Sequence, residues 1–330
     1  MANQVASLKM EQKLKKTPAG EIPVDWEAWT LGEMCLRTPE YGANVSAIEF
    51  KPEWPRYVRV TDIDDAGVLS STDRKSIKVE DAKQYLLGVG DIIFARSGAT
   101  VGKTYLYRKS DGPCAFAGYT IRFSPDPQRL LPEFLFQFTH SQLYYQWVKG
   151  MLRAGAQPNI NGSEYSGLLL PIPPLREQKK IAEILSAVDA AIDKTNAVIE
   201  KAEILKLGLM RQLCLEGMAK HKKFKMTELG RIPESWDLQP CEKLCELITV
   251  GIVVQPARLY TDSGVPCFRS LNILEDSISD DRMVFISPEA NEAHSKSRLR
   301  EGDVVAVRTG YPGTACVVPK KIRGGPTVSI

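Results

Sequence analysis

The chain has 330 residues, of which 43% are hydrophobic, 25% charged and 8% aromatic. This ordinary composition excludes wholesale disorder and collagen-like repeats, and the length predicts two domains with sizeable cores. The formal net charge of +3 neither requires nor excludes a nucleic-acid partner, so charge has to be judged locally.

The first 19 residues are predicted to be a basic leader and not a signal peptide. They carry charges where a signal peptide has its apolar segment, and no stretch reaches the roughly 18 apolar residues of a membrane helix. We therefore expect a cytoplasmic protein with no membrane partner. The seven cysteines form no C-x-x-C pair and are interpreted as free thiols. Cys241 and Cys245 could supply one pair of zinc ligands, but the sequence shows no second pair. No metal site and no cofactor is therefore predicted.

The chain contains two copies of one sequence pattern. Three segments recur in the same order, at offsets of 210, 210 and 212 residues: Gly20–Trp26 as Gly230–Trp236, Arg59–Ile63 as Arg269–Ile273, and Gly90–Gly98 as Gly302–Gly310. Such self-similarity is typical of a duplicated domain in which each copy closes its own core. We assign the first copy to residues 20–174 and the second to residues 230–330. The second copy stops near the equivalent of residue 119, so we expect it to be incomplete.

Local patterns in the first copy predict its elements. Arg59–Ile63 and Gly90–Phe94 are predicted to be short strands, the second entered from a Gly-Asp turn. Trp26 and its counterpart Trp236 are expected to be core anchors. A helix is predicted from Pro132 to Lys149. Its apolar stripe consists of Phe134, Phe138, Tyr145 and Val148.

The strongest helix signal lies between the two copies. Residues 175–217 follow Pro173-Pro174 and contain no proline, which predicts a helix of about 60 Å. Four consecutive apolar heptads predict a coiled-coil-type helix that needs a partner, because leaving about ten aliphatic side chains in water would forfeit on the order of 15 kcal/mol. The residues predicted to serve helix pairing and subunit docking are Leu175, Ile181, Ile184, Leu185, Val188, Ile192, Val198, Ile199, Leu205 and Leu209. Residues 218–229 follow as a basic linker, whose lysines either contact a phosphate backbone or are simply solvated.

No catalytic constellation is found. Residues 98–104 resemble a phosphate-binding loop, but three residues separate the glycines where the motif has four, and a strand-like segment follows instead of a helix. The acidic cluster at residues 62–65 is interpreted as a solvated turn. We predict that the chain is not an enzyme. A nuclease or NTPase that holds phosphate with Lys103 and Thr104 is the alternative.

A basic residue beside a glycine turn occurs in both copies. The two segments are Arg96-Ser97-Gly98 and Arg308-Thr309-Gly310. An arginine next to exposed backbone N–H groups suits contacts to phosphates or to base edges. An internal salt bridge of each arginine would explain the pattern equally well.

The opening of the long helix reads Pro173-Pro-Leu-Arg-Glu-Gln178, and Ile181-Ala-Glu-Ile-Leu185 follows it. With these segments and a long helix between two copies of a domain, the sequence resembles the specificity (S) subunit of a type I restriction-modification system. The Ile-Pro-x-x-Trp segments and the Gly-Asp strands that end in Arg-x-Gly support this resemblance, which covers nearly all of the chain. It implies an α+β fold class, with repeated mixed α/β target recognition domains at 20–174 and 230–330 joined by a coiled-coil-type spacer helix at 175–217.

The resemblance also implies a function. In this family each target recognition domain reads one half of a bipartite double-stranded DNA site, and antiparallel spacer helices dock two modification methyltransferase subunits, which restriction (motor and nuclease) subunits join. The chain is thus expected to be a non-catalytic DNA-recognition and scaffold subunit. Base-reading residues are expected in residues 37–59 and 248–269 and beside the glycine turns. The residues predicted to contact DNA are Arg37, Tyr41, Asn44, Arg59, Arg96, Lys103, Arg269 and Arg308.

Two alternatives accompany this interpretation. An incomplete second copy would fit a silent copy, or a half-type subunit that self-associates through its spacer helix and reads a palindromic sequence. A coiled-coil adaptor that oligomerises without binding DNA would also explain the helix.

Overall fold

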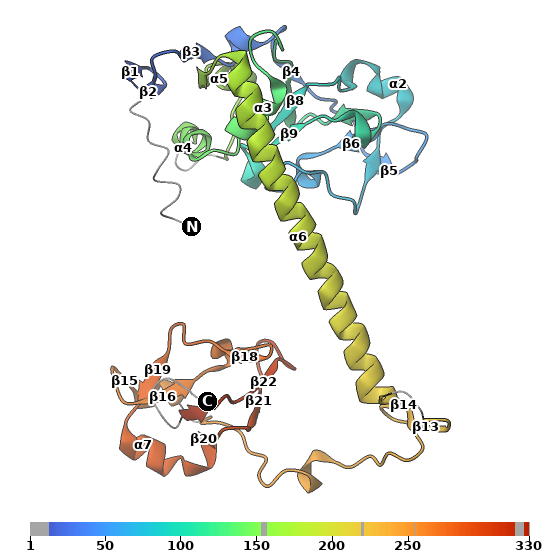
Figure 1. Ribbon diagram of the computed structural model, residues 1–330, viewed down its shortest axis with the longest axis vertical. Helices are drawn as coiled ribbons and strands as arrows, with labels where there is room; N and C mark the ends of the chain where they lie inside the picture. The colour runs from blue at the N-terminus through green and yellow to red at the C-terminus, as the bar shows by residue number, and fades with distance from the viewer. Residues whose placement is uncertain (1–12, 153–156, 219–220, 254, 321–326, 330) are drawn as a thin grey trace. The chain divides into compact units, whose positions relative to one another are not determined.

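The computed structural model describes residues 13–152, 157–218, 221–253, 255–320 and 327–329. The chain forms two compact units, called here the N-terminal unit (Met1–Gly208) and the C-terminal unit (Leu209–Ile330) (Figure 1). Helix α6 (Leu175–Glu216) begins in the first unit and continues into the second. Among the residues described, no helix combines the length and apolarity needed to cross a membrane.

Short strands and helices make up the N-terminal unit before α6. Its strands are β1 (Leu14–Thr17), β2 (Gly20–Pro23), β3 (Glu27–Thr30), β4 (Glu40–Tyr41), β5 (Ile48–Glu49), β6 (Arg56–Val58), β7 (Lys75–Ser76), β8 (Ile92–Ala95), β9 (Thr104–Leu106), β10 (Cys114–Phe116), β11 (Thr120–Phe123) and β12 (Leu169–Ile172). Its helices are α2 (Val79–Ala82), α3 (Pro132–Phe138), α4 (Gln142–Met151) and α5 (Gly162–Ser166).

Two four-stranded sheets form the body of this unit. Their strand orders are β4-β11-β8-β9 and β10-β6-β7-β5. Strand β8 is central in the first sheet, pairs antiparallel with both β11 and β9, and buries all four of its side chains. A short continuous apolar run is what such a buried strand requires. The strand predicted at Gly90–Phe94 is therefore confirmed, although it begins at Ile92.

Aromatic side chains fill the core between this sheet and the helices. The Phe94 ring lies 5.0 Å from the Tyr165 ring and 6.4 Å from the Tyr144 ring, measured between centroids. Both tyrosine hydroxyls are satisfied: Tyr144 donates to the Gly102 carbonyl and Tyr165 to the Ala95 carbonyl, each at 2.8 Å. Such partners offset the cost of removing a tyrosine hydroxyl from water.

The helix predicted over residues 132–149 is in fact two helices. Helix α3 ends at Phe138, and Ser141 begins α4, its hydroxyl accepting a hydrogen bond from the Tyr144 N–H at 3.3 Å. This side-chain cap restarts the helix in a new direction. As a result Tyr145, which was expected on the buried stripe, is 44% exposed.

The strand expected at Arg59–Ile63 is displaced. Strand β6 ends at Val58, and Val60–Asp62 form a 3-10 turn. The Asp62 carboxylate accepts the Arg59 backbone N–H at 2.9 Å and is only 3% exposed. The interpretation of the acidic cluster as a solvated turn is therefore wrong for Asp62, which is a buried cap.

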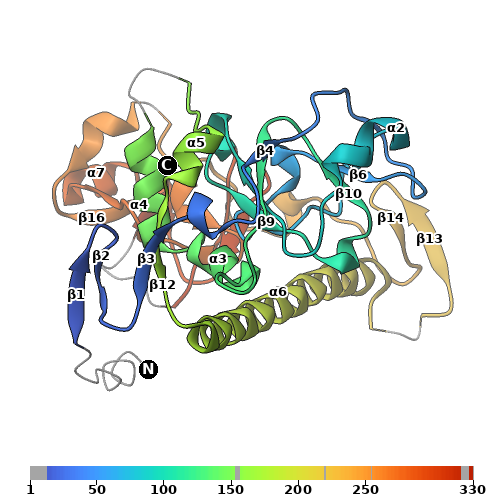
Figure 2. The ribbon, with the colours of Figure 1, turned by 90° about the horizontal axis from the view of Figure 1, so that it is seen from above.

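The first turns of α6 are anchored to the N-terminal unit. Gln178 is fully buried; its Oε1 accepts the Leu131 N–H at 2.8 Å, and its Nε2 donates to the Arg129 and Pro173 carbonyls, both at 2.9 Å. Helix α3 lies beside the next turns in both views (Figures 1 and 2), where a side-chain hydrogen bond joins the two helices. The spacer helix predicted at 175–217 is confirmed, one residue shorter.

Trp26 and Trp236 were expected to be core anchors, and this prediction is wrong. Both side chains are half-buried and lie at the ends of α6. The Trp26 indole N–H donates to Glu177 Oε2 at 3.1 Å. The Trp236 ring packs on Gly217, where a Cβ would come within 2.9 Å of it, and lies edge-on to the His221 ring. Gly217 also adopts φ +76°, the left-handed conformation in which helices often end.

The C-terminal unit consists of strands and one described α-helix beyond the end of α6. Its strands are β13 (Phe224–Thr227), β14 (Gly230–Pro233), β15 (Tyr260–Thr261), β16 (Val265–Phe268), β17 (Ile273–Leu274), β18 (Ser277–Ile278), β19 (Val284–Ile286), β20 (Arg298–Leu299), β21 (Val304–Ala306), β22 (Ala315–Val317) and β23 (Thr327–Ser329). The helix is α7 (Pro288–Ala293).

The two units repeat one strand arrangement. Hairpin β13–β14 has the register of β1–β2, shifted by 210 residues. The sheet order β5-β7-β6-β10 returns as β15-β19-β16-β23, with a parallel pair at the same place (β6 with β10, β16 with β23). The hairpin β8–β9 returns as β21–β22. The repeated pattern begins at β1 and β13, which lie inside the segments predicted to be leader (1–19) and linker (218–229).

Candidate nucleic-acid interface

Arg96 directly follows β8, and its backbone is held from both sides. The Arg96 N–H donates to the Tyr119 carbonyl at 2.9 Å, and the Arg96 carbonyl accepts the Ile160 N–H at 2.8 Å. Tyr119 precedes β11 and Ile160 precedes α5. Three segments that are distant in sequence therefore fix the position of this residue.

The Arg96 guanidinium is held by two neutral side chains. It lies over the Tyr41 ring, 4.9 Å from the centroid, and Nη2 donates to Asn159 Oδ1 at 3.3 Å. The Tyr41 hydroxyl accepts the Gly162 N–H at 3.0 Å, which fixes the ring. No ion pair joins Arg96 to a carboxylate within the described part of the chain. The salt-bridge alternative for Arg96 thus finds no support there.

Exposed polar and aromatic residues lie on the segments that contact this arginine. Tyr41 is 45% and Tyr119 65% exposed, and Asn44 and Asn159 are exposed as well. A bond from the Gly118 N–H to the Ala43 carbonyl, at 2.7 Å, joins the loops that carry Asn44 and Tyr119. We call these residues the Arg96 cluster: Tyr41, Asn44, Arg96, Tyr119 and Asn159.

Sequence reasoning missed two members of this cluster. Asn159 lies 63 residues after Arg96, and no pattern in the sequence links the two. Tyr119 follows Gly118 in a loop, so an aromatic residue in a turn was the only available signal. Only the tertiary structure brings the Asn159 side chain and the Tyr119 backbone to Arg96.

Arg37 is predicted to contact DNA, but its charge is already engaged within the unit. Its Nε donates to Ser124 Oγ at 3.0 Å, and its terminal nitrogens lie 3.5 Å from Glu40 and 3.9 Å from Asp91. The buried Arg122 completes this network through Glu40 at 2.6 Å. Arg37 thus has less free charge to offer a phosphate than Arg96 has.

Arg59 and Lys103 are also paired with carboxylates. Arg59 contacts Asp62 at 2.6 Å and Asp73 at 3.1 Å, and the Asp62 bond raises the pKa of Arg59. Lys103 lies 2.8 Å from Asp65 and, by this hydrogen bond, lowers the pKa of that carboxyl. The structure therefore does not gather all the predicted DNA contacts of the first copy around Arg96.

The predicted contacts of the second copy belong to the C-terminal unit. The Arg269 N–H donates to Asn272 Oδ1 at 3.1 Å, and its guanidinium donates to the Arg282 carbonyl. Arg308 follows β21 and is exposed, without an ion pair to any carboxylate that the structure describes. Tyr311, three residues later, is 83% exposed.

The segment that resembles a phosphate-binding loop is not built as one. Gly98–Thr100 form a 3-10 turn, and the chain continues into strand β9 as predicted. Thr104 is buried, with its hydroxyl 2.7 Å from that of Thr139. Lys103 is paired with Asp65. The two residues that an NTPase would use to hold phosphate therefore have other partners.

The cysteines are free thiols, as predicted. Burial raises the pKa of Cys35 to about 12 and that of Cys114 to about 11, which disfavours their reactive thiolate forms at neutral pH. Within the described ranges, no group of three or more His, Cys, Asp or Glu residues is placed to hold a metal ion.

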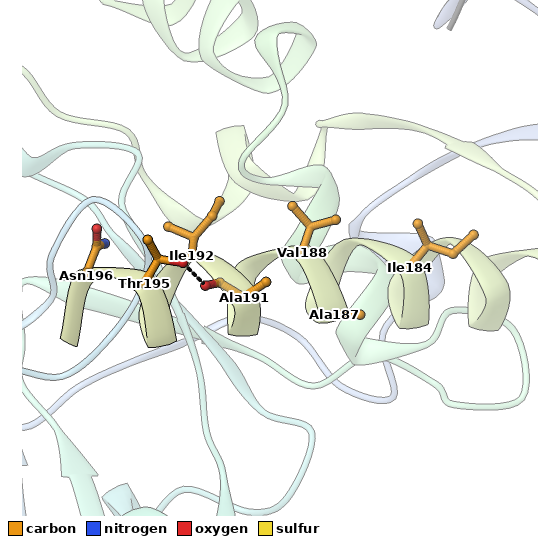
Figure 3. Close-up of a pocket in the computed structure, with 7 residues that line it drawn as sticks. All are labelled: Ile184, Ala187, Val188, Ala191, Ile192, Thr195 and Asn196. Carbon is orange, nitrogen blue, oxygen red and sulfur yellow. Dashed lines mark hydrogen bonds between the residues drawn. The ribbon is translucent and has the colours of Figure 1, made fainter. Parts of the chain in front are cut away.

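Helix α6 exposes the apolar stripe predicted from its heptads. Ile181 packs against the core of the N-terminal unit. The other nine predicted stripe residues are between 39% and 67% exposed. Part of the stripe forms a shallow groove lined by Ile184, Ala187, Val188, Ala191, Ile192, Thr195 and Asn196 (Figure 3). Burying such aliphatic surface against another helix would be favourable.

Comparisons with known proteins agree with this architecture. A family model described as the type I restriction modification DNA specificity domain matches residues 23–204. The putative type I restriction enzyme MjaX specificity subunit of Methanocaldococcus jannaschii is 32% identical over 236 residues, which cover 69% of this chain and 54% of that protein. The type I restriction enzyme EcoKI specificity subunit of Escherichia coli is 24% identical over 328 residues, which cover 92% of this chain and 66% of that protein.

A solved structure has the same fold. It comes from a study of complex assembly and conformational transition in a type I restriction-modification system, and it covers 93% of this chain and 74% of its own, with a TM-score of 0.51 and 19% identity. The chain spans about half the length of the MjaX relative. Because the family model matches more than half of the residues, the chain belongs to the family of type I restriction-modification DNA specificity domains.

Proposed function

We propose that the chain is the DNA-recognition and scaffold subunit of a type I restriction-modification complex in the cytoplasm. Each unit would read one half of a bipartite double-stranded DNA site. Helix α6 would hold the reading units and dock modification methyltransferase subunits, which restriction subunits then join. No chemical step is assigned to this chain, since methylation, ATP hydrolysis and cleavage belong to its partners.

The observation that carries this proposal is that the same strand arrangement occurs twice in the chain, once before and once after a single long helix. The sheet β5-β7-β6-β10 and its counterpart β15-β19-β16-β23 flank the 42 residues of α6. Two similar modules joined by a helix suit the reading of two DNA segments separated by a gap. The names of the MjaX and EcoKI relatives support the same role.

The Arg96 cluster supplies the chemistry that a DNA reader needs. Arginine and asparagine side chains contact base edges, and both, like tyrosine, also contact phosphates. In this cluster the tyrosines and asparagines are exposed and Arg96 is half-buried, with its backbone hydrogen-bonded to two distant segments. Such prior ordering lowers the entropy that binding would otherwise cost.

A gel-shift titration of the full chain with its methyltransferase subunit tests the proposal. Against a pool of random duplexes, the preferred sequence should bind about 1,000-fold more tightly than the bulk. Raising the salt from 50 to 200 mM should weaken binding about 100-fold if four phosphates are contacted. Equal affinity for all sequences would contradict the proposed function.

Self-association through α6 is a second candidate property, favoured by the exposed stripe. Nine of its apolar side chains are exposed in the single chain. Two antiparallel copies of α6 would cover each other's stripes and build a symmetric reader with two N-terminal units. A coiled-coil adaptor without DNA binding would share this stripe but would give no gel shift.

A further inference from the structure

We propose that Arg96 reads a guanine in the half-site that the N-terminal unit binds. This inference rests on the proposed function and deepens it, because it names the base that one residue recognises. It follows from the way the arginine is held, from the N–H groups it leaves open and from the chemistry of its neighbours.

The arginine is fixed before any DNA arrives. Its backbone N–H and carbonyl are both hydrogen-bonded, to Tyr119 and Ile160. The planar guanidinium lies 4.9 Å from the centroid of the Tyr41 ring, which is itself held by the Gly162 N–H. A side chain fixed in this way keeps the orientation of its donors and loses little entropy on binding.

Most of the guanidinium donors are left open. Of the five N–H groups of an arginine, only one on Nη2 donates to a described residue, the Asn159 side chain. Nη1 therefore keeps both of its N–H groups and Nη2 keeps one, so each terminal nitrogen still has a donor to offer. The Nε atom of Arg96 is buried and has no acceptor among the described residues, so the donors available to a ligand are those of the two terminal nitrogens.

Guanine matches this pair of donors. In the major groove it presents O6 and N7, two acceptors side by side, which a guanidinium binds in bidentate fashion. Adenine presents N7 beside its N6 amino group, and a donor facing the arginine is unfavourable. Cytosine and thymine each offer at most one acceptor there.

The surroundings favour a base edge over a phosphate. The neighbours of Arg96 in the cluster are neutral side chains: Tyr41, Asn44, Tyr119 and Asn159. Lys103 and Arg59, which would strengthen a phosphate site, are paired with Asp65 and Asp62. A phosphate site normally gathers several positive charges that remain free.

The test is a binding selection from a duplex library with 20 randomised base pairs, using the full chain as wild type, R96K and R96A. Lysine keeps the charge but loses the planar fork. The matched control is K109A, which removes an exposed cation at the opposite end of the β8–β9 hairpin. Thermal unfolding of each variant shows whether it is folded.

The expected result is a wild-type motif with a required guanine. Its preference over the other bases should drop about 5-fold to 150-fold in R96A, and by a smaller factor in R96K, whose ammonium donates to guanine without the planar fork. The K109A motif should equal that of the wild type. Replacing that guanine with 7-deazaguanine, which lacks the N7 acceptor, should weaken the wild type but leave R96A, which has no donor at this position, unchanged.

Three results would overturn the inference. A uniform loss of affinity in R96A that R96K restores, with an unchanged motif, would make Arg96 a phosphate contact and leave the proposed function intact. If the Arg96 variants lose base preference at a motif position where the wild type does not require guanine, the inference is also rejected. If the wild type selects no motif at all, the proposed function itself fails.

Discussion

Asp62 and Asn272 occupy matching places in the two copies and make the same hydrogen bond. Asp62 accepts the Arg59 N–H at 2.9 Å, and Asn272 accepts the Arg269 N–H at 3.1 Å. Both side chains are buried, and each caps a 3-10 turn. The common requirement is a short side chain with an acceptor oxygen, which either residue supplies.

Replacing Asp62 should therefore reveal which of its bonds stabilises the unit. D62A leaves the Arg59 N–H and guanidinium without their buried acceptor and should lower the free energy of unfolding by about 2 kcal/mol. D62N keeps the backbone bond, as in the second copy, and should cost about half as much. Urea denaturation measures both. D65A, at a 94% exposed carboxylate, is the control and should stay within about 0.5 kcal/mol of the wild type. Equal losses in D62A and D62N would assign the effect to the ion pair instead.

The Pro-Pro-Leu-Arg-Glu-Gln segment acts as a joint between the N-terminal unit and α6. Glu177 accepts the Trp26 indole N–H, and Gln178 is buried with three hydrogen bonds to the backbone of Arg129, Leu131 and Pro173. Glutamine can make all three because its amide both donates and accepts. The motif that indicated the family thus has a local physical task, which is to fix the direction in which α6 leaves the unit.

Substitution of Gln178 should weaken this joint. Q178A strands one buried N–H and two carbonyls, so the free energy of unfolding of the N-terminal unit should fall by about 2 to 4 kcal/mol. The neighbouring K179A, at an exposed position, should change it by less than about 0.5 kcal/mol. Thermal and urea denaturation followed by circular dichroism compare the two variants. A Q178A protein as stable as K179A would show that packing of Ile181 and Ala182 holds the helix without the amide.

For the whole molecule, the central question is what covers the apolar stripe of α6. Val188 and Ile192 line the groove in Figure 3 and are 51% and 52% exposed. Ala190 and Ala197 lie on the opposite side of the helix, at 100° per residue. Aspartate pairs at these two places therefore introduce the same charge on different faces.

The double variant V188D/I192D should abolish association. Light scattering of the wild-type chain alone should give twice the 36.7 kDa of one chain, whereas V188D/I192D should remain at one chain, since burying two carboxylates against a partner helix is unfavourable. A190D/A197D should behave like the wild type. A190D/A197D should unfold at the wild-type midpoint, because both positions are exposed and lie away from the stripe. V188D/I192D should unfold at a lower midpoint, since it loses the stabilisation that association gives the folded chain. A wild-type chain that stays at 36.7 kDa, alone and with a methyltransferase subunit, would rule out the stripe as a docking surface.

Much of the architecture could be predicted because periodicity and repetition are local signals. The α6 heptads placed the helix to within one residue, and three collinear matches indicated the duplication that the strand orders now display. The break between α3 and α4 was missed, since the single Ser141 cap outweighed an apolar spacing that ran through it. The 3-10 turn after β6 was missed because its cap, Asp62, looked like one of several surface acids.

The sequence alone determined that two similar modules flank a long helix with one apolar side, since the residues that encode these features are neighbours in the chain or repeat at a constant offset. Only the tertiary structure decided which arginines are free. It brought Arg37 to Asp91 and Ser124, Arg59 to Asp73, and Arg96 to Tyr41 and Asn159. Contacts between side chains far apart in sequence depend on how the strands and loops are arranged in space, and hydrophobic periodicity carries no information about that arrangement.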